Sequence, residues 1–156
     1  MLRKDREITD PAEILAVLRR CDTVRLGLRG EEYPYVVPVS FGLAEEDGRP
    51  VLYFHGARAG LKTALLKARP EVCVEADRLL RYERTAHGIT ARCESVIGFG
   101  RAVPVEGAEK LAGLRAINEH CGFPDYPVES CASLAGTAVY KIALVSLTGK
   151  RNPPAP

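Results

Sequence analysis

The stretch from Val51 to Leu66, VLYFHGARAGLKTALL, changes its hydrophobic period partway along, and this change limits the folds open to the chain. Val51 to Phe54 is a short run of apolar and aromatic residues, which is typical of a β-strand. From Leu61 onward apolar residues recur every three or four positions, as they do on one face of a helix. We therefore expect a strand that ends at His55-Gly56, then a glycine-rich loop, then a helix.

Lys62 falls in the first turn of the expected helix, shortly after Gly60. Unpaired backbone N–H groups, the positive end of a helix dipole and a lysine together favour an anion, most often a phosphate. The phosphate loop of NTPases requires G-x-x-x-x-G-K-[ST]. Here the second glycine comes one residue early and the lysine one residue late, which argues against NTP hydrolysis. The alternative is an ordinary glycine-rich turn with Lys62 in solvent.

The composition is that of an ordinary soluble domain of 156 residues. A net charge of +2 and the lack of an extended basic block argue against a nucleic-acid binder. We find no signal-peptide core and no apolar run of membrane-spanning length, so we expect a cytoplasmic protein without a membrane partner. The five cysteines form no CxxC pair or zinc-type spacing, so we expect reduced thiols and no metal.

Three elements precede the central stretch. The first is a helix that Asp10 can cap and that begins at Pro11, and the second is an alternating strand from Val24 to Leu28. The third is an extended segment, Tyr33 to Phe41, which contains two prolines. Proline cannot donate to a strand ladder, so this segment must be interrupted, bulged or at a sheet edge. Its backbone is then available to a ligand.

The rest of the chain predicts a mainly β fold with helices. We expect a hairpin turn at 44–48, strands at 72–76, 91–105 and 137–148, a loop at 78–88 and a helix at 107–118. About six strands with irregularly placed helices favour an antiparallel barrel over a doubly wound parallel sheet. We expect one domain over residues 1–150 and a disordered tail at 151–156.

Four segments together resemble the flavin-binding split-barrel family, which includes pyridoxamine 5′-phosphate oxidase. They are YPYVVPVSFG, LYFHGARAGLKTALL, CESVIGFGRAVPV and VYKIALVSLTGK. The resemblance runs from about Thr9 to Lys150 and is closest to the nitroimidazole-resistance (Nim-type) branch. It implies a six-stranded antiparallel split β-barrel that forms a homodimer, with FMN, or alternatively FAD, in a groove between the subunits.

The resemblance also implies a set of cofactor-binding residues. They are Pro38, Val39 and Ser40 along the isoalloxazine edge, Phe54, His55, Gly56 and Ala57 beside the ring and ribityl chain, Gly60 and Lys62 at the phosphate, and Ser95 with Val96 completing the phosphate pocket. His55 is the candidate catalytic residue, since a histidine beside the ring can donate a proton to substrate. The alternative for His55 is a purely structural role, and Ser95 could instead satisfy its own strand backbone.

These features predict an FMN-dependent oxidoreductase that acts on a small molecule, with nitroaromatic compounds as the candidate substrates. Two alternatives remain open. One is a flavin-binding module without turnover of its own, and the other is an oxidase-like activity on a different substrate. In a flavin enzyme the cofactor carries the hydride chemistry, so the lack of an evident acid–base pair does not exclude catalysis.

Overall fold

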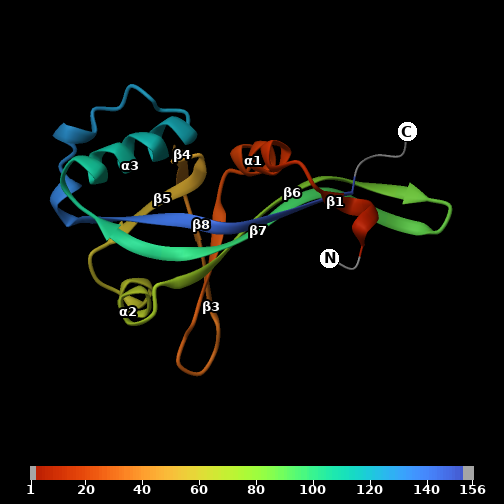
Figure 1. Ribbon diagram of the computed structural model, residues 1–156, viewed down its shortest axis with the longest axis horizontal. Coiled ribbons are helices and arrows are strands. Elements are labelled where there is room, and N and C mark those ends of the chain that lie inside the picture. The colour runs from red at the N-terminus through yellow and green to blue at the C-terminus, as the bar shows by residue number, and fades with distance from the viewer. Residues whose placement is uncertain (1–2, 153–156) are drawn as a thin grey trace.

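The computed structural model describes residues 3–152, which form one antiparallel sheet with three α-helices (Figure 1). The strands are β1 (Glu7–Ile8), β2 (Val24–Leu28), β3 (Tyr35–Val39), β4 (Phe41–Glu46), β5 (Arg49–Ala57), β6 (Glu71–Thr85), β7 (Gly88–Val105) and β8 (Thr137–Asn152). The helices are α1 (Pro11–Arg19), α2 (Leu61–Ala68) and α3 (Gly107–His120), with single 3-10 turns η1 (Lys4–Arg6), η2 (Val128–Ser130) and η3 (Leu134–Gly136). None of the helices in residues 3–152 is both long and apolar enough to cross a membrane.

The sheet follows the order β3-β2-β6-β7-β8-β5-β4, and β1 adds to β8. Strands β3 and β4 lie at opposite ends of this order, yet only Ser40 separates them in the chain. The two ends of the sheet must therefore meet, so the sheet curls into a barrel that stays open between β3 and β4. The predicted antiparallel split barrel is confirmed. It has eight strands rather than six, because β1 was missed and the expected 33–41 strand divides into β3 and β4.

Two apolar clusters hold the fold together, one on each side of β5. Leu52 and Phe54 point into the barrel core, whereas Val51 and Tyr53 pack beneath α3 with Ile117. Burial on both faces explains why the sequence here is a continuous apolar run rather than an alternating one. Strand β5 therefore separates the barrel interior from a second layer formed by α3.

Helix α1 begins as the sequence predicts. The Asp10 carboxylate accepts a hydrogen bond from the backbone N–H of Ala12 at 2.9 Å, and Pro11 occupies the first helical position. The helix buries Ile14, Val17 and Leu18 in the barrel core. It thereby closes one side of the barrel.

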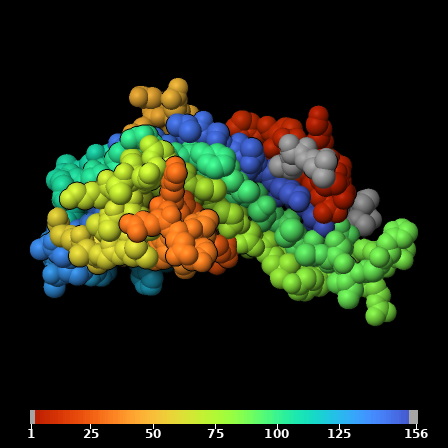
Figure 2. All heavy atoms as spheres, turned by 90° about the horizontal axis from the view of Figure 1, so that it is seen from below, coloured from red at the N-terminus to blue at the C-terminus, as the bar shows by residue number. Residues whose placement is uncertain are grey.

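The predicted loop at 78–88 is wrong, because β6 and β7 continue through it as a long hairpin. Strand β8 ends opposite Cys93, so the hairpin beyond this point has only two strands. Figures 1 and 2 show it as an arm projecting from the body of the molecule. Leu80, Tyr82 and Ile89 are exposed on the arm.

The predicted start of the tail at residue 151 is wrong. Arg151 and Asn152 pair with Glu94 and Cys93 in the last part of β8, so these two residues are strand rather than tail. The other residues of that prediction, 153–156, lie outside the described part of the chain.

Candidate functional site

The strand–loop–helix stretch forms as predicted, with one correction to its boundary. Strand β5 does not end at His55, because His55, Gly56 and Ala57 continue to pair with Val139, Ala138 and Thr137 of β8. The loop is therefore only residues 58–60, and α2 follows it at once. Gly60 has a φ of 121°, a backbone conformation that L side chains rarely adopt, so this position suits a glycine.

Lys62 reaches back from α2 over the end of β5. Its Nζ donates a hydrogen bond to the carbonyl oxygen of His55 at 3.4 Å and lies 5.4 Å from the centroid of the Phe54 ring. A Cβ at position 56 would lie 2.8 Å from this Nζ. Glycine at position 56 therefore leaves the space that the ammonium group occupies.

The ammonium group of Lys62 lacks an opposite charge. Within residues 3–152 it takes part in no ion pair, although its side chain is half-buried. Desolvation by the surrounding protein lowers the pKa of Lys62. A partly desolvated cation without a carboxylate partner is energetically unfavourable by itself, and a bound anion would relieve that cost.

The first turn of α2 adds donors beside Lys62. Gly60 caps the helix without a side-chain hydrogen bond, so the first backbone N–H groups have no side-chain acceptor. Thr63 braces the loop by donating from Oγ1 to the carbonyl oxygen of Ala57 at 3.0 Å. The arrangement of N–H groups and a lysine is suited to phosphate, as the sequence predicted.

The C-terminal end of the two-proline segment, residues 33–41, lies beside this site. Strand β3 is the terminal strand of the sheet order, and Pro38 pairs only with Arg25 of β2. The prediction of an interrupted edge strand is thus confirmed, with the interruption at Ser40. Phe41 pairs with Phe54, and one further step in this register puts the exposed Ser40 beside His55. Val39 is different, because its side chain is buried in the barrel core.

The His55 ring lies on the other face of β5 from the Lys62 ammonium group. His55 is directly opposite Val139, which packs under α3, whereas Gly56 and Phe54 face the barrel side. Desolvation lowers the pKa of His55, and the positive charge of Lys62 lowers it further. The imidazole is therefore neutral at pH 7 and reaches solvent on the α3 side.

Phe54 and Ala57 differ in what they can offer a ligand. Phe54 is fully buried and stacks on Tyr140, with ring centroids 5.0 Å apart, so its side chain belongs to the core. Only its backbone can border a ligand. Ala57, by contrast, is exposed at the end of β5.

Ser95 and Val96 do not lie near Lys62 in the same chain. Ser95 pairs with Lys150 of β8, whereas Gly56 pairs with Ala138, twelve residues earlier on that strand. At about 3.3 Å per residue the two positions are roughly 40 Å apart along β8. Val96 is also buried in the barrel core. A second copy of the chain would be needed to bring Ser95 to the phosphate site.

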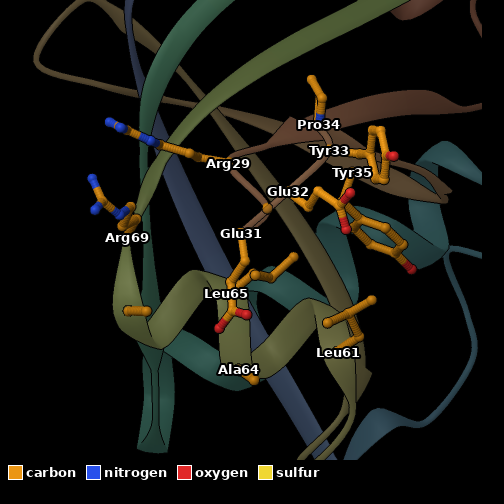
Figure 3. A pocket seen from close by; sticks show the side chains of 12 residues that line it. Arg29, Glu31, Glu32, Tyr33, Pro34, Tyr35, Leu61, Ala64, Leu65 and Arg69 are labelled. Atoms are coloured by element: carbon orange, nitrogen blue, oxygen red, sulfur yellow. The ribbon is translucent and has the colours of Figure 1, made fainter.

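Sequence reasoning missed a cavity of about 730 Å³ that lies beside α2. Figure 3 shows it between the β2–β3 connection and one face of the helix. Its lining consists of Arg29, Gly30, Glu31, Glu32, Tyr33, Pro34, Tyr35, Leu61, Ala64, Leu65, Ala68 and Arg69. The two walls are far apart in sequence, and the glycine and acidic residues of the connection predict only a turn.

Across residues 3–152, histidine, cysteine and acidic side chains do not gather in groups of three or more that could hold a metal ion. All five cysteines are free thiols.

Comparisons with known structures agree with this architecture. A protein from Bacteroides thetaiotaomicron named for 5-nitroimidazole antibiotic resistance is 27% identical, with a TM-score of 0.81, over 92% of this chain and 85% of that one. The flavocytochrome Anf3 from Azotobacter vinelandii is 24% identical, with a TM-score of 0.74, over 96% and 72% of the two chains. An FAD- and heme-binding protein from Mycobacterium smegmatis is 20% identical, with a TM-score of 0.78, over 97% and 76%. Below 25% identity the likeness supports the fold alone.

A search of curated proteins finds no match to the sequence. Residues 10–151, nearly the whole chain, match the family described as pyridoxamine 5′-phosphate oxidase. With the antiparallel split barrel and the strand–loop–helix site in place, the chain belongs to the pyridoxamine 5′-phosphate oxidase family.

Proposed function

We propose that this protein is a flavin-dependent oxidoreductase that binds FMN through the ribityl phosphate at Lys62. The observation that carries the proposal is the half-buried Lys62 ammonium group, which has no ion pair among residues 3–152 and lies over Gly56 at the start of α2. These residues fit a phosphate by charge, by available N–H donors and by space. Membership in the pyridoxamine 5′-phosphate oxidase family supports the flavin itself.

The substrate class follows from the similar structures and is part of the proposal. A nitroaromatic acceptor is favoured by the likeness to the protein named for 5-nitroimidazole resistance. A bound flavin supplies two-electron transfer from a reductant to such an acceptor. The chain supplies position and charge for this transfer, and we propose that it does so in the cytoplasm.

Each part of the site has a separate task. The free edge of β3 at Pro38 and Ser40 offers backbone groups to the edge of the isoalloxazine ring. Gly56 leaves room for the Lys62 ammonium group, which holds the phosphate together with the first turn of α2, and the exposed Ala57 borders the ribityl chain. If His55 gives a proton, the substrate must approach from the α3 side of β5, because the ring lies on that side.

A second copy of the chain would complete the site. Ile97 and Phe99 are 43% and 53% exposed on the outer face of β7, while Val96 and Gly98, which alternate with them along the strand, are buried. Ser95 is two residues before Ile97 on the strand, so its side chain lies on the same outer face. We propose that two copies pack through this face, which covers its apolar side chains and carries Ser95 toward the partner's phosphate site.

The position of His55 favours one alternative function. Its ring and the Lys62 ammonium group lie on opposite faces of β5, so the candidate catalytic residue is separated by the strand from the proposed phosphate site. Such a site could hold flavin without turnover. Reduced holoprotein that passes electrons to a nitroaromatic compound no faster than free reduced FMN would identify a flavin-binding module rather than an enzyme.

The proposal is tested by titrating apoprotein with FMN. A hydrogen bond to a charged group contributes about 1.5–3 kcal/mol, so Lys62→Ala should weaken binding about ten- to a hundred-fold. Lys67→Ala is the matched control, because Lys67 is an exposed lysine on the same helix but in its last turn rather than its first. Equal FMN affinity in the Lys62→Ala variant and the parent would show that the phosphate does not bind at Lys62.

A further inference from the structure

The β6–β7 arm is a hairpin that the rest of the described chain leaves uncovered. Within residues 3–152, β8 ends opposite Cys93, and β2 pairs with β6 no further along the strand than Glu75. A two-stranded hairpin is marginally stable by itself in water. Tyr82 and Ile89 on the arm are 69% and 76% exposed. Two free strand edges and large exposed apolar side chains indicate a surface that packs against another molecule.

The arm shares one face with the proposed dimer surface, the outer face of β7. Residues directly opposite each other in an antiparallel pair have their side chains on the same face. Tyr82 is opposite Ala91, and Arg84 is opposite Ile89. Ala91 and Ile89 are an even number of residues from Ile97, so their side chains lie on the outer face with it. The exposed apolar surface therefore continues from the barrel wall onto the arm.

The proposed dimer fixes the direction in which the arm extends. Ser95 lies at the arm end of β7, whereas Lys62 and α2 lie at the opposite end of the barrel (Figure 1). Ser95 of each copy can reach the phosphate site of the other only if the two β7 strands run in opposite directions. Ile89 is six residues beyond Ser95, or roughly 20 Å at about 3.3 Å per residue. The arm therefore extends past the phosphate site, over the α2 end of the other copy.

The cavity beside α2 lies at this end. Its volume is about 730 Å³, and Leu61 in its wall directly precedes Lys62. Tyr33 and Leu61 are 73% and 59% exposed, so the cavity presents large apolar surfaces. Glu31 and Glu32 also line it, and neither takes part in an ion pair within residues 3–152. Figure 3 shows the Glu32 carboxylate beside the tyrosine rings, on the side of the cavity where α2 begins.

Charge favours this cavity as the place where the arm docks. Arg84 is exposed and takes part in no ion pair within residues 3–152, so it complements the cavity carboxylates. The arginines of the cavity, Arg29 and Arg69, lie at its other end, near the C-terminus of α2 (Figure 3). Another cavity, of about 470 Å³ at the start of α3, suits the arm less. Among the described residues that line it, Lys110 is charged and none is acidic.

We propose that the β6–β7 arm of each copy docks in the cavity beside α2 of the other copy. The inference rests on the two-copy site of the proposed function and adds the segment that covers it. The apolar side chains of the arm pack on Tyr33 and Leu61. Arg84 forms an ion pair with Glu31 or Glu32. Each phosphate site is then closed on its cavity side by the other copy.

Charge reversal on either side of the contact tests the docking. Arg84→Glu and the double variant Glu31→Arg, Glu32→Arg should each weaken dimerisation of FMN-loaded protein about tenfold in sedimentation, because a two-fold dimer contains the contact twice. These positions are exposed, so the fold should persist, and a thermal melt checks this. Combining the two sets of reversals brings opposite charges together again and should recover the dimerisation constant of the parent.

Arg49→Glu and Glu45→Arg are the matched controls. Both residues are exposed on the β4–β5 hairpin, outside the cavity and outside β7, so reversing their charges should leave dimerisation unchanged. Flavin release gives a second readout. Arg84→Glu should speed the release of FMN, because the arm no longer closes the site, whereas Arg49→Glu should not.

The outcomes separate this inference from the proposed function. If Phe99→Lys yields monomer but neither reversal weakens the dimer, the arm does not dock in the cavity and the two-copy site stands. If both reversals weaken the dimer and the combined variant does not recover it, the arm and the cavity do not meet. Cosedimentation with phosphatidylglycerol vesicles that Arg84→Glu abolishes, without a change in dimerisation, would assign the arm to a membrane surface instead. A parent that is wholly monomeric with FMN bound overturns both the inference and the two-copy site, while the Lys62→Ala titration still tests the phosphate site.

Discussion

Lys62 and His55 are coupled electrostatically although their charged groups lie on opposite faces of β5. Desolvation is the larger cause of the lowered pKa of His55, and the charge of Lys62 is the second. We therefore expect the His55 pKa, followed by NMR chemical shift, to lie below its usual value of about 6.5. In Lys62→Met it should rise, and in Lys67→Met it should not. A His55 pKa that does not move in Lys62→Met would contradict the described contact.

The same coupling sets the direction of one pH effect on stability. Because the pKa of His55 is lower in the folded chain than in the unfolded chain, the unfolded chain binds the proton first as the pH falls. The contribution of His55 is therefore complete above a pH of about 6.5 and is lost as the pH falls through its folded pKa. In His55→Gln this part of the pH dependence should be absent from denaturant melts.

At this scale the sequence predicts local chemistry better than side-chain direction. The places of Gly56 in the strand, Gly60 before the helix and Lys62 in its first turn could be predicted, because they depend on neighbours a few residues away, while their cofactor roles stay predictions. The direction of the His55 ring could not be predicted. It is set by the pairing of β5 with β8, some eighty residues later, which keeps His55 in the strand and so fixes the face on which its side chain lies. The distance from Ser95 to Lys62 depends in the same way on strand register, which no local pattern reports.

Among the elements, α3 depends on a close approach to β4. A Cβ at Gly42 would lie 2.3–2.5 Å from backbone atoms of Ala116 and Ile117, so the helix would have to move. We expect Gly42→Ala to lower the free energy of unfolding by about 1–3 kcal/mol, the usual cost of overpacking, as measured by urea denaturation. Gly136→Ala is the control, since its Cβ would meet no atom within 4 Å. Equal stability of the two variants would mean that α3 does not pack on β4 as described.

Elements whose signals are local could be predicted, and elements that rely on distant pairing could not. The cap at Asp10 depends on residues within a few positions, and so does the turn at Asp47-Gly48, in which Asp47 and Gly48 both have positive φ. The β6–β7 arm was mistaken for a loop because both of its faces meet solvent. Without one buried face there is no apolar alternation to indicate a strand.

For the whole molecule, the proposed dimer makes assembly and flavin binding interdependent. Phe99→Lys puts a charge in the centre of the outer face of β7, so we expect it to yield monomer in sedimentation and to weaken FMN binding. Phe123→Lys alters another exposed phenylalanine, in the segment after α3, and should keep the dimer. A parent protein that is wholly monomeric when loaded with FMN would rule out the two-copy site.

The most direct test of the central claim compares FMN with riboflavin, which differ only by the ribityl phosphate. If Lys62 holds that phosphate, the parent apoprotein should bind FMN at least about tenfold more tightly than riboflavin. In Lys62→Ala most of this preference should disappear, because FMN loses affinity while riboflavin keeps it. A preference for FMN that is absent from the parent, or that persists unchanged in Lys62→Ala, would contradict the assignment of the site.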